Sequence, residues 1–184
     1  VNSLLEEFPG EALRLVLLQT HYRAPLDFTK YGVQQAKATL DRMYAALRNT
    51  PAVLAGSDAP NPNRVQEALE DELNTPLALA GLHETITALN AASDITSKAQ
   101  AKRDVLAAGE LLGLLQENPE DWLRWQPVGG EGRLDDGAVD DRVAQRTEAR
   151  KARNFTESDR IRDELTEAGV ALEDKPEGTI WRRS

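Results

Sequence analysis

Apolar side chains recur at helical spacing along the first 125 residues, and no alternating strand pattern appears before residue 169. The clearest example is the segment 31–48, in which apolar residues fall at positions i, i+3, i+4 and i+7: Leu40, Met43, Tyr44 and Leu47. Proline and glycine separate this segment from similar ones. The pattern therefore predicts four to five helices with short connections, packed as an antiparallel bundle.

Breaking and capping residues set approximate bounds for these helices. The first is expected to begin at Pro9 and Gly10 and to end before Pro25, because proline is favourable only in the first turn of a helix. Further helices are expected at 31–48, at 64–73, from Pro76 onward and at 97–115. A loop is expected at 50–62, which contains three prolines, and a short turn near 118–125.

The chain changes character after residue 125. Residues 126–137 contain four glycines and one proline, and we expect them to form a linker. Two helices follow, predicted at 140–153 and 155–168, and then a hairpin with strands at 170–173 and 179–182. The sequence thus predicts a mainly α protein, with a helical bundle at 1–125 and a small α+β module of two helices and a β-hairpin at 138–184.

The net charge of −9 is distributed unevenly. Residues 1–137 hold 12 Lys and Arg against 20 Asp and Glu, whereas residues 138–184 hold 10 against 11. Between residues 142 and 162, seven basic residues outnumber three acidic ones. The acidic character therefore belongs to the predicted bundle, and the module is locally basic.

The sequence offers little that supports catalysis or metal binding. It contains no Gly-rich phosphate loop, Ser-His-Asp grouping or HExxH motif, no cysteine, and only two histidines. We therefore expect a chain that is non-catalytic by itself and holds no metal. No apolar run approaches ~20 residues and the start does not resemble a signal peptide, so no membrane span is predicted and a cytoplasmic location is expected.

Four arginines fall on one side of the helix predicted at 140–153: Arg142, Arg146, Arg150 and Arg153. Guanidinium groups in such a stripe are suited to contacts with RNA phosphates, and Arg142, Arg146 and Arg153 are the candidates for contacts with the RNA backbone. The alternative is a solvated face whose aliphatic stems cover Val139 and Val143.

Aromatic, acidic and basic residues lie close to this stripe in the sequence: Phe155, Asp159, Asp174, Trp181, Arg182 and Arg183. Unpaired RNA bases are held by stacking on aromatic rings and are read by polar groups at their edges, so this mixture indicates RNA binding. Ile180 is expected to face the core, which would place Trp181 on the outer face of its strand. Phe155 could equally belong to the core, and Trp181 could pack on the bundle.

Several runs resemble those of one family. FPGEALRLVLLQTHYRAPLDF opens the chain, DELNTPLALA covers 71–80, and RTEARKARNFTESDRIRDEL and GVALEDKPEGTIWRR form the tail. On these runs the chain resembles the C-terminal part of bacterial-type cysteinyl-tRNA synthetases along essentially its whole length. It departs from the family at Glu11, where the Asp of Asp-Ala-Leu-Arg is usual, and at Phe155, where Trp is frequent.

The resemblance implies a function that composition does not show. Members of this family join cysteine to tRNA(Cys) with ATP, in a catalytic domain that carries HIGH-type and KMSKS-type motifs and a zinc site. None of these is in this sequence. The resemblance implies that the bundle contacts the tRNA stem and that the module reads the GCA anticodon. The expected partners are tRNA(Cys) and the catalytic domain of the same polypeptide, with zinc and ATP bound only by that domain and the protein a monomer.

Motif positions in the family assign roles to single residues of this chain. Asp159 and Asp174 would accept hydrogen bonds from base edges, Phe155 or Trp181 would stack, and Arg150 would contact a base or phosphate. The junction with the catalytic domain is expected at His21, Tyr22 and Arg23. Two other interpretations stay open: a cysteine ligase of the mycothiol pathway, which needs no anticodon reader, and a helical protein-interaction module.

Overall fold

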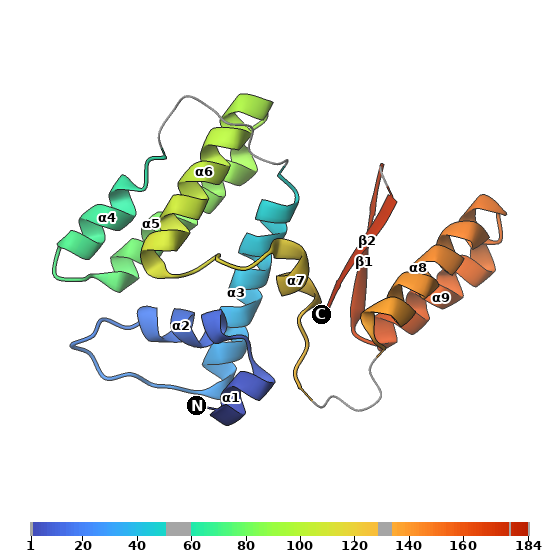
Figure 1. Ribbon diagram of the computed structural model, residues 1–184, viewed down its shortest axis with the longest axis horizontal. Helices are drawn as coiled ribbons and strands as arrows, with labels where there is room; N and C mark the ends of the chain where they lie inside the picture. Colours follow the sequence, from blue (N-terminus) through green and yellow to red (C-terminus); the bar gives the residue numbers. More distant parts are fainter. Residues whose placement is uncertain (1, 51–59, 129–133, 177, 184) are drawn as a thin grey trace. The chain divides into compact units, whose positions relative to one another are not determined.

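The computed structural model describes residues 2–50, 60–128, 134–176 and 178–183 (Figure 1). The chain divides into two compact units, Val1–Trp122 and Leu123–Ser184. The described part of the first unit is helical, and the second unit adds a two-stranded antiparallel sheet to its helices. The predicted mainly α architecture with a C-terminal hairpin is confirmed.

The first unit contains α1 (Asn2–Glu7), α2 (Gly10–Leu18), α3 (Lys30–Arg48), α4 (Asn63–Glu70), α5 (Thr75–Ala91) and α6 (Ile95–Leu112). Helix α5 packs against α4 and α6, and α2 packs against α3 (Figure 1). Helix α7 (Pro119–Arg124) spans the boundary between the two units. The predicted loop at 50–62 lies largely outside the described residues.

Several helix boundaries differ from the prediction. Helix α2 ends at Leu18, well before Pro25, α4 ends at Glu70, before the predicted 73, and α1 was not predicted at all. Helix α6 ends at Leu112 because the backbone of Gly113 is left-handed (φ 63°). Glycine adopts this conformation more readily than other residues, and it commonly ends helices. Leu114 and Leu115 then enter the core as part of a turn, not of a helix.

The carboxylate of Glu11 joins three segments of the first unit. It accepts hydrogen bonds from the Tyr44 hydroxyl (2.9 Å) and from the backbone N–H groups of Leu115 (3.0 Å) and Gln116 (2.9 Å). Because α2, α3 and the turn after α6 meet at this carboxylate, Glu11 of the EALR run is a structural residue.

Tyr44 extends this network toward α7. Its hydroxyl oxygen accepts the backbone N–H of Glu117 (3.0 Å), and its ring stacks on Trp122 with centroids 4.5 Å apart. Burial raises the pKa of the Tyr44 hydroxyl well above its ordinary value, so the group stays neutral. The indole N–H of Trp122 donates to Asp41 (2.8 Å), which closes the network on α3.

The second unit packs a helix pair against the hairpin. Helices α8 (Asp136–Lys151) and α9 (Phe155–Glu167) are followed by β1 (Val170–Lys175) and β2 (Gly178–Arg183). The core is formed by Val139, Ile161, Leu165, Val170 and Trp181. Helix α8 begins earlier than predicted, inside the expected linker, because Asp135 caps it by accepting the N–H of Ala138 (2.7 Å).

Candidate nucleic-acid interface

Asp174 lies near the end of β1 and pairs with Arg150 in the last turn of α8. The guanidinium of Arg146 forms two hydrogen bonds with this carboxylate, Nη1 to Oδ1 (2.8 Å) and Nη2 to Oδ2 (3.0 Å). Arg150 Nη1 donates to Oδ2 (2.6 Å), and the Thr179 hydroxyl donates to Oδ1 (2.7 Å). One carboxylate therefore ties α8 to both strands.

The electrostatics of this cluster favour its charged form. Hydrogen bonds from Arg146, Thr179 and Arg150 hold the pKa of Asp174 well below its usual range, despite partial burial. The same carboxylate raises the pKa of Arg146. The side chain of Arg146 is only 8% exposed, whereas those of Asp174 and Arg150 are 44% and 49% exposed.

Phe155 opens α9 at the same end of the unit, and 62% of its surface is exposed. The interpretation of Phe155 as a core residue is therefore wrong. Asn154 caps the helix by accepting the N–H of Glu157 (3.2 Å), and Arg153 before it is exposed and held at φ 60°. Asp159, one turn along α9, is exposed and close enough to Arg146 to raise the pKa of that arginine.

Trp181 does not face outward as the sequence predicted. It is 2% exposed, and its indole N–H donates to Asp140 (2.6 Å). The hairpin register pairs Trp181 with Leu172, which places it on the same face as Val170, whereas Ile180 lies on the opposite face and is only half-buried. The guanidinium carbons of Arg124 and Arg183 lie 4.5 Å and 5.1 Å from the ring centroid, so Trp181 has no free face for a base.

Two further arginines have structural partners instead of the predicted RNA contacts. Arg183 is buried and donates to the carbonyl of Leu134 (2.8 Å) and to Asp136 (2.7 Å). Arg146, predicted to contact phosphate, is buried against Asp174. The expectation that these two side chains are accessible is therefore wrong, and the burial of Arg146 also differs from the alternative of a solvated arginine face.

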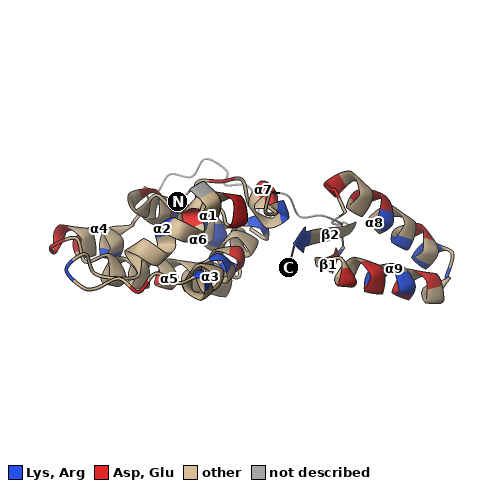
Figure 2. Ribbon diagram, turned by 90° about the horizontal axis from the view of Figure 1, so that it is seen from below, with Lys and Arg blue, Asp and Glu red and all other residues tan. Residues whose placement is uncertain are grey.

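The remaining predicted basic residues are at least partly accessible. Arg142 is half-buried and pairs with Glu164 (3.0 Å), and Arg182 is half-buried and pairs with Glu173 (3.5 Å). Lys and Arg on α8 and α9 are interspersed with Asp and Glu (Figure 2). The accessible cluster therefore consists of Arg150, Arg153, Phe155, Asp159 and Asp174, and we call it the α8–α9 end cluster.

The three residues predicted at a domain junction lie together in the first unit. His21 stacks on Tyr22 with centroids 4.7 Å apart, and Arg23 lies over the Tyr22 ring and pairs with Glu72 (2.9 Å). Exposed apolar side chains occur in the same part of the chain, and we call this set the N-terminal apolar patch: Leu5, Leu17, Tyr22, Leu26, Phe28 and Tyr31. Sequence reasoning identified only Tyr22 of this set.

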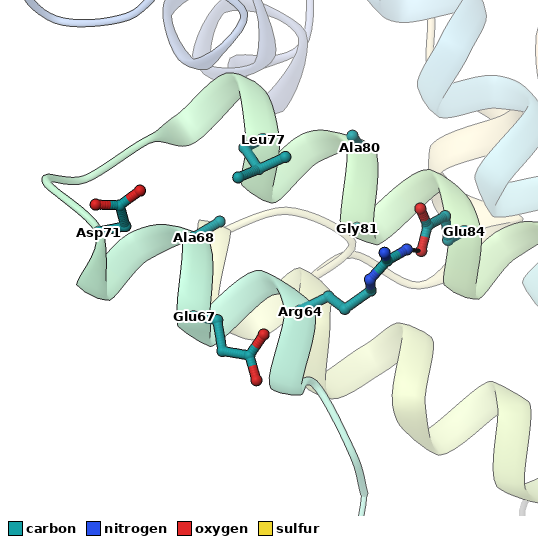
Figure 3. A pocket seen from close by; sticks show the side chains of 8 residues that line it. All are labelled: Arg64, Glu67, Ala68, Asp71, Leu77, Ala80, Gly81 and Glu84. Carbon is teal, nitrogen blue, oxygen red and sulfur yellow. Dashed lines mark hydrogen bonds and ion pairs between the residues drawn. The ribbon is translucent and has the colours of Figure 1, made fainter.

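A groove of about 320 Å³ between α4 and α5 has the wrong charge for RNA (Figure 3). Its lining includes Glu67, Asp71 and Glu84, and Arg64 forms an ion pair with Glu84. Because three carboxylates and only one guanidinium line the groove, the groove repels phosphate. It does not extend the candidate RNA surface.

Within the ranges that the structure describes, no helix is both long and apolar enough to cross a membrane. The same ranges contain no group of three or more potential ligands that could hold a metal ion.

Comparison with known proteins assigns both parts of the chain. Residues 64–116 match a DALR domain, and residues 136–182 match a cysteinyl-tRNA ligase anticodon binding domain. The cysteine–tRNA ligase of Rhodospirillum rubrum is 50% identical over 184 residues, which are 100% of this chain and 40% of that protein. The cysteine–tRNA ligase of Paramagnetospirillum magneticum is 48% identical, over 100% of this chain and 40% of that protein. The one of Parvibaculum lavamentivorans is 47% identical, over 99% of this chain and 39% of that protein.

In this chain a DALR domain precedes a cysteinyl-tRNA ligase anticodon binding domain, which marks the chain as part of an aminoacyl-tRNA synthetase. The chain belongs to the cysteine–tRNA ligase family and matches the C-terminal region of its relatives. It spans about 40% of their length. The resemblance stated from the sequence is confirmed.

Proposed function

We propose that this chain is the tRNA-binding portion of a cysteine–tRNA ligase and that its second unit reads the anticodon of tRNA(Cys). The observation that carries the proposal is the α8–α9 end cluster, which lies within the match to an anticodon binding domain. The cluster combines an exposed aromatic ring, accessible guanidinium groups and carboxylates at one end of a small unit. Proteins bind unpaired RNA bases by stacking them on aromatic rings and by hydrogen bonds at their edges, and this combination of groups can supply both.

Each group in the cluster has a distinct role in this proposal. Phe155 stacks on an unpaired base, and Arg153 and Arg150 contact the phosphates that flank it. Asp159 and Asp174 accept hydrogen bonds from amino groups of the bases. Carboxylates suit a GCA anticodon because guanine, cytosine and adenine each carry an exocyclic amino group.

The remaining roles follow from the family and are part of the same proposal. The full-length protein ligates cysteine to tRNA(Cys) with ATP, and zinc and ATP bind in the catalytic region that this chain does not span. The DALR domain contacts the tRNA stem. The N-terminal apolar patch, with His21 and Arg23 near it in the sequence, packs against the catalytic region, because exposed large apolar side chains favour a protein contact over RNA. We propose a cytoplasmic monomer.

Binding of tRNA transcripts tests the anticodon role. Affinities for tRNA(Cys) and for the same transcript with each anticodon base changed are measured by fluorescence anisotropy at several salt concentrations. The GCA transcript should bind more tightly at every salt concentration, because base contacts respond less to salt than phosphate contacts do. Equal affinity for all transcripts would refute the proposal. It would instead favour the protein-interaction alternative.

A further inference from the structure

All acceptor positions of Asp174 are occupied in the free protein. A carboxylate offers about four lone-pair positions, and this one receives four hydrogen bonds: two from Arg146, one from Arg150 and one from Thr179. An amino group of a base therefore reaches Asp174 only by replacing one of these donors. The identity of the replaced donor determines how the site recognises a base.

The donors differ in how easily they are displaced. Arg146 is buried and binds through both Nη atoms in a planar, two-bond geometry. Thr179 is held directly opposite Asp174 by the hairpin register. Arg150 is half-exposed and makes a single hydrogen bond, so it is the donor that an incoming base displaces. Its guanidinium is then free to pair with a phosphate.

We propose that Arg146 is the positioning residue of the anticodon site, and that its two-bond contact holds Asp174 in the orientation needed to accept a base. This inference rests on the proposed function. Asp174 and Thr179 are the hydrogen-bond partners of the Arg146 guanidinium, whose Nε has no partner in the described structure. The arginine therefore acts on RNA through Asp174 and not by touching a phosphate.

Arg146→Lys separates orientation from charge, because lysine keeps the positive charge but lacks the planar two-bond geometry. The 184-residue chain is tested with two RNA hairpins, one carrying a GCA anticodon loop and one with the middle base of the anticodon changed. We expect the preference of the wild-type chain for GCA to fall about tenfold in R146K, with affinity for the altered hairpin nearly unchanged. Arg142→Lys, one turn earlier on α8, is the matched control and should keep the preference.

Thr179→Val provides a milder second variant, since it removes one of the four donors and preserves the β-branched shape. It should weaken the preference by a smaller factor, because both bonds from Arg146 to Asp174 remain. If R146K does not fold, Arg146→Gln replaces it, because its planar amide can donate to Asp174 but cannot form the two-bond contact. Retention of the full GCA preference by R146K, or by R146Q in that case, would overturn the positioning role and leave the proposed function intact.

If the wild-type chain binds the two hairpins equally, the proposed function is rejected. An NMR titration of the Asp174 carboxyl group in the free chain then tests the positioning contact by itself. R146K should raise the pKa of Asp174 clearly more than R142K does. An equal pKa in the two variants would overturn the contact as well.

Discussion

Both units hold a tryptophan in place through a carboxylate, but in different chemical surroundings. Trp122 donates to Asp41 (2.8 Å) and stacks on the neutral ring of Tyr44, whereas Trp181 donates to Asp140 (2.6 Å) and lies near two guanidinium groups. In the first unit, the Glu11 carboxylate accepts hydrogen bonds from backbone N–H groups and a hydroxyl. In the second, the Asp174 carboxylate accepts hydrogen bonds from arginines and a threonine hydroxyl.

The comparison shows why the number of basic residues in a sequence is larger than the number of cations that are exposed to RNA. Arg146 and Arg183 are buried in the second unit and serve its carboxylates and carbonyls. Arg150 and Arg153 are exposed at the end of α8. A small unit with a core of five residues therefore uses charged pairs to hold its elements together, and presents only a few cations to a ligand.

Trp181→Ala should have the largest effect, because it opens a cavity in this small core and leaves Asp140 without the indole donor. We expect the free energy of unfolding of the second unit to fall by about 3–5 kcal/mol. Denaturant unfolding followed by hydrogen exchange of the α9 amides measures it. The matched control is Phe155→Ala, whose exposed ring should change stability by less than about 0.5 kcal/mol. Comparable losses in the two variants would contradict the buried position of Trp181.

Tyr44→Phe tests the hydroxyl network of the first unit. It removes the donor to Glu11 and the acceptor of the Glu117 N–H, so we expect a loss of about 2 kcal/mol in the free energy of unfolding. Urea denaturation followed by circular dichroism measures it. Tyr31→Phe is the control, since Tyr31 is largely exposed. A Tyr44→Phe variant as stable as the control would show that the network adds nothing to stability.

Phe155→Ala should weaken RNA binding without lowering stability, whereas Trp181→Ala lowers stability. Affinity for the GCA hairpin should weaken by about 1–2 kcal/mol through the loss of one stacking interaction, while the unfolding midpoint stays the same. Anisotropy titration and thermal melting of one preparation measure both quantities. Unchanged affinity would remove Phe155 from the proposed interface.

Acidification should produce the smallest effect, through Asp174. Its pKa is lower in the folded chain than the value of about 3.9 expected when unfolded, so the carboxylate stabilises the fold above pH ~4. That contribution is lost as the pH falls toward the folded-state pKa. The difference in unfolding midpoint between wild type and Asp174→Asn should therefore shrink between pH 6 and pH 2. A constant difference across this range would show that the charge on Asp174 does not contribute.

Helical spacing and breakers predicted most elements of the fold, because these signals are local. The end of α6 was not predicted correctly, because Leu114 and Leu115 continue the apolar spacing of the helix but reach the core from a turn after Gly113. The end of α2 was not predicted correctly either. The start of α8 was placed too late because the capping role of Asp135 was overlooked.

The site was harder to predict, because one assumption about a strand decided several residues. Assigning Ile180 to the core placed Trp181 outside, whereas the register that pairs Lys175 with Gly178 puts Trp181 on the same face as Val170 and Leu172. This register could be predicted from the sequence. The burial of Arg146 could not be predicted, because an arginine stripe has the same spacing whether its side chains face solvent or a carboxylate.

The left-handed backbone of Arg153 has a consequence for which residues this position accepts. Glycine adopts such a conformation without strain, whereas other L-residues do so at a cost of about 1–2 kcal/mol. The residue at this position, between α8 and α9, is Arg153, although the backbone conformation alone would favour glycine. The left-handed backbone places a long, flexible cation two residues before Phe155, and the side-chain torsions of Arg153 are ordered only at a cost when a ligand arrives.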